Sequence, residues 1–194
     1  MLTFIFLATC VSVLGFLSCL LAVVNTRSPH RVKKLPSGSD NTLPRIPRNL
    51  AQLHSMMDYT QFEIFSTALI IARGEGHRFK EHSGKANDKG IDARLYNIHH
   101  NIVAVQSKLY AHDNHIEPTQ VRDFIGAVTV SEAVYGFFVT TSTFTDAAQR
   151  AAYSSRGRVR TIDGQQIEVL LQQRAREVAL AYKDVLSIFE EDEA

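Results

Sequence analysis

Cysteine is almost absent from this chain. Its two cysteines, Cys10 and Cys19, both lie in the first 24 residues, so the rest of the chain contains no disulfide. At about 100° per residue, two positions nine apart in a helix point to roughly opposite faces, and these two cysteines cannot bridge each other. A disulfide-stabilised small domain is therefore excluded, and the cysteine-free remainder fits a reducing compartment.

Charge of either sign is also missing from the first 24 residues, although the chain contains 21 basic and 20 acidic residues. The apolar run Leu2–Val24 is long enough to span about 30 Å of hydrocarbon. A secretory signal peptide is the main alternative, but it needs a basic start and usually a shorter apolar region. The first positive charges follow the run, at Arg27 and Arg31. We therefore expect a transmembrane anchor over residues 1–24 and a single-pass membrane protein with its C-terminal part in the cytoplasm.

A large excess of one charge is missing as well, since the formal net charge is +1. Residues 25–48 contain six basic residues and only one acidic residue, Asp40, together with Pro and Ser, which is typical of an extended linker. Residues 49–194 are then slightly acidic. A DNA-binding surface on this domain must therefore be a local patch, because the domain as a whole is not basic.

Apolar periodicity predicts an α/β sandwich around a mixed sheet. Helical patterns cover residues 50–72, a helix that opens at Glu117-Pro118, a helix after the N-cap candidate Thr145, and residues 165–189. Strands are expected as a short edge strand at residues 77–79, a buried strand at residues 135–140 and a short strand at residues 159–162. Asp163-Gly164 is interpreted as a turn.

The stretch from Gly90 to Lys108 is predicted to form a β-hairpin with its turn at residues 97–101. Gln106 and Lys108 are two positions apart and therefore project from one face of the second strand. Pairing of the strands brings Asp92 near that face. A carboxylate, an amide oxygen and an ammonium group would then converge, which is the minimum equipment of a metal-assisted phosphodiester nuclease. The alternative for Asp92 and Lys108 is a salt bridge across a hairpin.

The Asp…Gln-x-Lys pattern alone is weak, but the motifs around it occur in a specific order. They are Phe62-Glu63, Gly90-Ile91-Asp92, Val105-Gln106-Ser107-Lys108, Val121-Arg122-Asp123-Phe124-Ile125-Gly126, Gly136-Phe137-Phe138-Val139-Thr140-Thr141, Phe144-Thr145-Asp146-Ala147-Ala148 and Ile162-Asp163-Gly164. With these motifs, residues 59–171 resemble the Mrr-like catalytic domain, a branch of the PD-(D/E)xK restriction endonuclease-like superfamily. The loop before Asp92 departs from the family, because Lys89 stands where a glycine is usual.

The resemblance implies a restriction endonuclease-like α/β sandwich over residues 49–194, with a central mixed sheet flanked by helices. It implies a DNA endonuclease that depends on Mg²⁺ or Mn²⁺ and acts on modified or foreign DNA. Asp92 would be the principal metal ligand, Gln106 would help to shape the metal site, and Glu63 would be a supplementary ligand. Lys108 would orient the attacking water and offset charge growing on the phosphate.

The same resemblance implies DNA as the substrate. The apolar N-terminal run is expected to contact the membrane, and a homodimer would allow both DNA strands to be cut, because one domain provides one active site. Mrr-type enzymes normally carry a separate recognition domain, so specificity is expected to be low or to come from a partner protein. Three alternatives stay open. They are a DNA- or nucleotide-binding module that keeps the fold without cutting, a structural membrane factor in which the domain only mediates assembly, and a DNA repair or junction-resolving nuclease.

Two further groups of side chains have competing interpretations. The histidine pairs His99-His100 and His112-x-x-His115 are predicted to be solvated loop residues, and we assign no zinc site to them. The cationic side chains near the C-terminal third are equally compatible with phosphate contacts and with plain solvation. They are Arg150, Arg156, Arg158 and Arg160.

Overall fold

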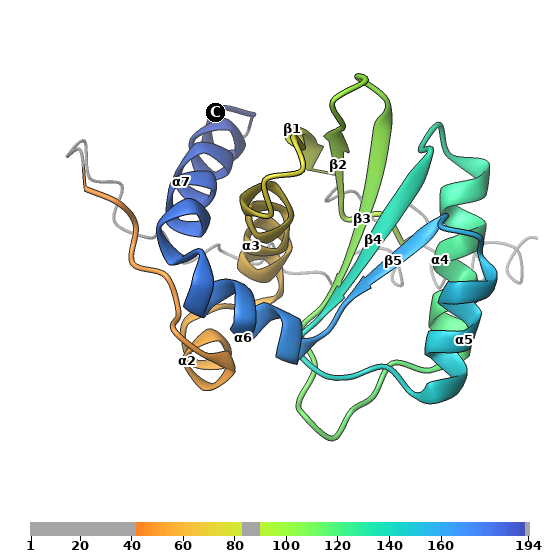
Figure 1. Cartoon of the computed structure of the whole chain (residues 1–194). Helices are drawn as coiled ribbons and strands as arrows, with labels where there is room; N and C mark the ends of the chain where they lie inside the picture. The colour runs from red at the N-terminus through yellow and green to blue at the C-terminus, as the bar shows by residue number, and fades with distance from the viewer. Residues whose placement is uncertain (1–41, 83–89, 193–194) are drawn as a thin grey trace, which may run out of the picture. The chain divides into compact units, whose positions relative to one another are not determined.

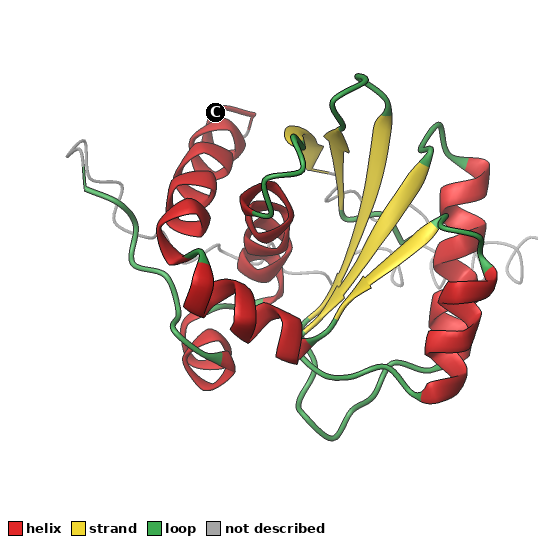
Figure 2. Ribbon diagram, viewed as in Figure 1, coloured by secondary structure: helices red, strands yellow, loops and turns green. Residues whose placement is uncertain are grey.

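The structure, a computed structural model, describes residues 42–82 and 90–192. These residues form a five-stranded sheet and six helices (Figures 1 and 2). In chain order the elements are α2 (Leu50–Met56), α3 (Tyr59–Ala72), β1 (Arg78–His82), β2 (Ala93–Tyr96), β3 (Ile102–Lys108), α4 (Pro118–Val130), β4 (Tyr135–Thr140), α5 (Asp146–Ser154), β5 (Val159–Ile162), α6 (Gly164–Gln173) and α7 (Ala175–Asp192).

The sheet is mixed, with the spatial order β1-β2-β3-β4-β5. The first three strands are antiparallel, whereas β3, β4 and β5 run parallel. Helices α4 and α5 make the two crossover connections between the parallel strands, and consistent crossovers put both helices on one face. Helices α3 and α7 cover the other face (Figure 1). The predicted sandwich, a mixed sheet flanked by helices, is therefore confirmed.

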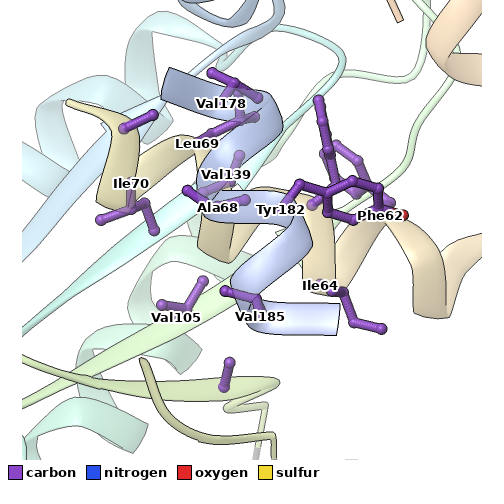
Figure 3. Close-up of a cluster of buried hydrophobic side chains, with 14 of the residues drawn as sticks. Phe62, Ile64, Ala68, Leu69, Ile70, Val105, Val139, Val178, Tyr182 and Val185 are labelled. Atoms are coloured by element: carbon purple, nitrogen blue, oxygen red, sulfur yellow. The ribbon is translucent and has the colours of Figure 1, made fainter. Parts of the chain in front are cut away.

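Two hydrophobic clusters hold the layers together, one on each face of the sheet. The larger cluster lies between the sheet and α3 and α7 (Figure 3). Within it, Tyr182 of α7 and Phe65 of α3 meet edge to face with ring centroids 5.3 Å apart. Such an aromatic pair contributes about 0.5–1.5 kcal/mol beyond the burial of its surface. The larger cluster packs α3 against both α7 and β3, and this position matters because α3 contains Glu63.

Residues 50–72 form two helices rather than the single helical stretch predicted from the sequence. The chain leaves helical geometry at Met57, and Asp58 then begins α3 with a capping box. The Asp58 side chain accepts a hydrogen bond from the Gln61 backbone N–H, and the Gln61 side-chain oxygen accepts one from the Asp58 backbone N–H. A capping box satisfies two otherwise unpaired backbone donors, so it makes a new helix start favourable inside an apolar pattern.

Residues 165–189 are likewise interrupted, at Arg174, where the backbone turns out of helical geometry (φ −134°, ψ 33°). The Arg174 guanidinium donates from Nη1 to the backbone oxygen of Ala72 at 3.3 Å, so the break is coupled to the end of α3. The predicted turn at Asp163-Gly164 is instead a helix start. Asp163 is the N-cap of α6 and makes a capping box with Gln166.

The predicted hairpin is confirmed, with β2 and β3 paired antiparallel around residues 97–101. The strands predicted at residues 135–140 and 159–162 are confirmed as β4 and β5, and Thr145 caps α5 as expected. The edge strand is longer than predicted, because β1 continues to His82 and pairs with β2 through an irregularity between Phe79 and Glu81.

The single-pass membrane localisation predicted from the sequence is wrong for the part of the chain that the structure describes. No helix in residues 42–82 and 90–192 is long and apolar enough to cross a membrane. Helix α7 reaches 18 residues, but it is amphipathic and includes charged residues such as Arg176 and Lys183. The predicted anchor, residues 1–24, and most of the predicted linker lie outside the described residues. At the linker's end, Pro47 is buried and Ile46 packs against the larger cluster.

Candidate active site

The candidate site lies at the end of the sheet where β3 finishes and β2 begins. Ala93 pairs with Val105, so the preceding residue, Asp92, falls beside Gln106. The Asp92 N–H donates to the backbone oxygen of Val105 at 2.8 Å, and the Ser107 N–H donates to Asp92 Oδ2 at 2.6 Å. Two hydrogen bonds to β3 therefore fix both the backbone and the carboxylate of Asp92.

The Asp92 carboxyl has its pKa raised from 3.8 to about 6. Burial is the largest cause, and the negative charge of Glu63 adds to it, whereas the Ser107 N–H and the positive charges of Lys108 and His82 act in the opposite direction. A like charge beside a desolvated carboxylate disfavours its ionised form. A cation bound between Asp92 and Glu63 would relieve this repulsion.

Gln106 is positioned by the glycine two residues before Asp92. Gly90 has φ +82°, a conformation that glycine adopts without penalty, and a Cβ at this position would lie 3.0 Å from Gln106 Nε2. The amide therefore packs directly on the Gly90 backbone. Its oxygen, Oε1, is buried and has no hydrogen-bond partner among residues 42–82 and 90–192. A buried amide oxygen without a partner is costly, and a hard cation is one group that would satisfy it.

Lys108 is the last residue of β3 and lies two positions beyond Gln106 on the same side of the strand. It is half-buried, and its charge lowers the pKa of Asp92. In the part of the chain that the structure describes, Lys108 forms no ion pair within 4.0 Å, so the alternative of a salt bridge across the hairpin is not what the geometry shows. Its ammonium group therefore has no carboxylate within ion-pair distance among the described residues.

Glu63 reaches this region from α3. Its Oε2 is 2.9 Å from His82 Nε2, and the His82 ring packs edge to face against Phe189 of α7 with centroids 5.1 Å apart. The carboxylate is thus held between β1 and α3 while its charge still acts on Asp92. All four predicted site residues, Glu63, Asp92, Gln106 and Lys108, therefore belong to one region of the molecule.

Two contacts of the site were not predicted. His82, the partner of Glu63, lies in a stretch with the composition of a polar loop, and the sequence contains no periodic signal that β1 reaches so far. Ser107 contributes its backbone N–H, and a backbone donor leaves no trace in residue type. Register alone identifies it, because it follows the residue opposite Asp92.

The loop histidines lie apart from this cluster as exposed residues, with His100 near Arg78 (3.1 Å) and His115 near Thr143 (2.8 Å). Arg160 lies over the ring of Tyr135 at 4.1 Å and reaches Glu75 at 3.4 Å. The other three arginines of the predicted basic group lie at the surface, one within α5 and two in the turn after it. They are Arg150, Arg156 and Arg158.

The donor set fits a divalent metal ion in part. In residues 42–82 and 90–192 no three His, Cys, Asp or Glu side chains form a ready ligand cluster. Two carboxylates and one amide oxygen do meet the preference of Mg²⁺ for a few hard oxygen ligands with water completing its shell. The unpartnered Gln106 oxygen and the electrostatically strained Asp92 carboxylate are consistent with this chemistry.

A mixed sheet with a carboxylate, an amide and an ammonium at one end is the arrangement expected of a restriction endonuclease-like hydrolase. The restriction endonuclease family that comprises the Mrr catalytic domain matches residues 54–171. The chain belongs to this family, and the match supports a DNA-cleaving hydrolase. No curated protein matches the chain.

Solved restriction endonucleases share the fold. The MspJI restriction endonuclease, solved with a 27-mer oligonucleotide, is 20% identical with a TM-score of 0.54, over 72% of this chain and 33% of that one. The DNA modification-dependent restriction endonuclease AspBHI is 17% identical with a TM-score of 0.51, over 77% of this chain and 41% of that one. This chain therefore aligns with well under half of either enzyme.

Proposed function

We propose that this chain is a metal-dependent DNA endonuclease that cuts modified or foreign DNA. The observation that carries the proposal is the convergence of Asp92 and Gln106 at the end of β3, with Lys108 on the same strand and Glu63 within electrostatic reach. The preference for modified DNA is inferred from the modification-dependent enzyme AspBHI, whose fold is similar. The domain that acts is proposed to be residues 49–194.

The proposed roles follow from the chemistry of each group. Asp92 and Gln106 would hold Mg²⁺ or Mn²⁺ through oxygen atoms, with Glu63 as a supplementary ligand. A bound divalent ion supplies an acidified water and stabilises a phosphoryl oxygen. The Lys108 ammonium would orient the attacking water and offset charge developing on the phosphate. The hydrogen bond from the Ser107 N–H would keep the Asp92 carboxylate in one orientation for metal binding.

Cleavage of plasmid DNA by the full chain tests the proposal. The substrates are supercoiled plasmids, one unmodified and one carrying 5-methylcytosine, each incubated with Mg²⁺, with Mn²⁺ or with EDTA. We expect metal-dependent nicking or linearisation that Lys108→Ala and Asp92→Asn reduce at least about 10³-fold. A greater rate on the methylated plasmid is expected for a modification-dependent enzyme.

The matched controls are Lys183→Ala and Asp184→Asn, the same two substitutions on α7. Both should cut at the wild-type rate. Full activity of Lys108→Ala, or cutting that persists in EDTA, would refute the proposal. Tight binding without cutting by a folded protein would instead identify a DNA-binding module. Preference for a four-way junction over both plasmids would identify a junction-resolving nuclease. The oligomeric state is a separate measurement, and light scattering would detect a dimer.

A further inference from the structure

The carbonyl group of Lys108 receives three hydrogen-bond donors at the end of β3. Thr140 donates from Oγ1 at 3.0 Å, the backbone N–H of Thr141 donates at 3.2 Å, and the backbone N–H of Tyr110 donates at 3.1 Å. Thr140 is the register partner of Lys108 in the parallel pair of β3 and β4. The backbone of Lys108 is therefore fixed by the last residues of the neighbouring strand.

The side chain of Thr141 extends this pairing beyond the end of the strand. Its Oγ1 accepts from the Tyr110 N–H at 2.9 Å and donates to the Tyr110 backbone oxygen at 2.8 Å. One hydroxyl thus satisfies both backbone groups of Tyr110, as an opposing strand residue would. Thr140 and Thr141 are buried (0% and 2% exposed), so these bonds are shielded from competing water.

Gly164, the first residue of α6, contacts the backbone of the segment that contains the two threonines. The Gly164 N–H donates to the backbone oxygen of Ser142 at 2.9 Å, and a Cβ at Gly164 would lie 2.4 Å from the Thr141 backbone oxygen. Only glycine fits at this distance. The segment 140–142 therefore has little room to move away from β3.

We propose that Thr140 and Thr141 are positioning residues that direct the Lys108 ammonium group toward the reacting phosphate. Neither hydroxyl caps a helix, since α5 is capped by Thr145, and both hydroxyls bond to the end of β3 and the residue that follows it closely, Tyr110. Because Lys108 is the last residue of its strand, its backbone direction depends on these bonds. The inference rests on the proposed role of Lys108 in catalysis.

The test is the steady-state kinetics of plasmid cleavage by the full chain carrying Thr141→Val or Thr140→Val, substitutions that keep the shape and remove the hydroxyl. Displacement of a catalytic group by about 1 Å can cost about 100-fold in rate. We expect kcat to fall about 10- to 100-fold, with KM for the plasmid within about 3-fold of wild type. Thr141→Ser and Thr140→Ser restore the hydroxyl and should regain most of kcat.

Thr129→Val is the matched control, because its hydroxyl bonds only within α4, to the backbone oxygen of Ile125. It should leave kcat and KM unchanged. Circular dichroism at the assay temperature establishes that each variant is folded, and if a valine variant unfolds, the serine variants decide. A serine variant that is folded but no more active than Lys108→Ala would overturn the inference.

Two further outcomes would also overturn it. Wild-type kcat in both valine variants would show that the bonds do not position Lys108. A raised KM with unchanged kcat would make Thr141 part of the DNA-contact surface instead, since it lines a pocket of about 700 Å³ with Ser142 and His112. If Lys108→Ala itself retains activity, the proposed function fails first, so the two failures are distinguishable.

Discussion

Replacing Asp92 by asparagine should make the metal-free protein more stable at neutral pH. Folding raises the pKa of Asp92 from 3.8 to about 6, mainly through burial and the negative charge of Glu63. A group whose pKa is raised by folding costs stability when it ionises, so the penalty is absent below pH 3.8 and complete above the folded-state value. At 1.36 kcal/mol per pKa unit, the cost is about 3 kcal/mol at pH 7 and falls toward zero near pH 4.

The assay is urea unfolding of wild type and Asp92→Asn in EDTA at pH 4, 5.5 and 7.5. The chain has no tryptophan, so circular dichroism of the helices is the appropriate signal. Asparagine keeps an oxygen that can accept the Ser107 N–H, which isolates the effect of the charge. We expect an increase in the free energy of unfolding of about 3 kcal/mol at pH 7.5 and of less than about 1 kcal/mol at pH 4.

Asp184→Asn, an exposed change on α7, should alter stability by no more than about 0.5 kcal/mol at any of these pH values. Equal stability of wild type and Asp92→Asn at pH 7.5 would refute the electrostatic argument. Addition of Mg²⁺ should raise the stability of wild type by mass action and leave that of Asp92→Asn unchanged.

Three further predictions concern other parts of the molecule. Gly90→Ala and Gly157→Ala introduce the same positive-φ strain (φ +82° and +84°), so both should destabilise the protein by about 1–2 kcal/mol. Of the two, only Gly90 has a close neighbour, Gln106, so only Gly90→Ala should also lower the rate of plasmid cleavage, and equal rates in the two variants would refute the role of Gly90. Replacing Arg150, Arg156 and Arg158 by glutamine should weaken DNA binding. In a filter-binding titration, the slope of the logarithm of the binding constant against the logarithm of the salt concentration should become shallower by about 0.9 for each phosphate that is no longer neutralised, and an unchanged slope would mean that these arginines are only solvated. Tyr182→Phe removes a buried hydroxyl that has no hydrogen-bond partner in residues 42–82 and 90–192, so thermal unfolding should show unchanged or slightly higher stability. A decrease in stability of more than about 1 kcal/mol would mean that the hydroxyl does have a partner.

The sequence predicted those parts of the fold that leave a local pattern. The hairpin follows from the alternation around Asp92 and the β-branched run that ends at Lys108, and β4 follows from its continuous apolar residues. The helix breaks at Asp58 and Arg174 were not predicted, because the apolar spacing continues across both. What decides them is tertiary or local side-chain bonding, a capping box in one case and a bond to Ala72 in the other.

The candidate site was likewise predictable only in part. Asp92, Gln106 and Lys108 could be identified because their side chains have the proposed roles and these residue types follow one another in a recognisable order along the sequence. The Glu63–His82 contact joins α3 to the far end of β1, and no residue pattern encodes that the two elements are neighbours. The apolar run at residues 2–24 lies outside the described residues, and no described helix is long and apolar enough to support the membrane localisation that was predicted from it.

Helix α7 lies beyond the end of the family match at residue 171, yet it covers α3 and places Phe189 against His82. The unit that folds is therefore larger than the unit that sequence comparison recognises. A protein cut at the family boundary would keep every proposed catalytic residue but expose the apolar surface of α3 around Phe65 and release the histidine that holds Glu63. For this chain, boundaries for engineering or transplantation should be set by what buries α3 and not by where sequence similarity ends.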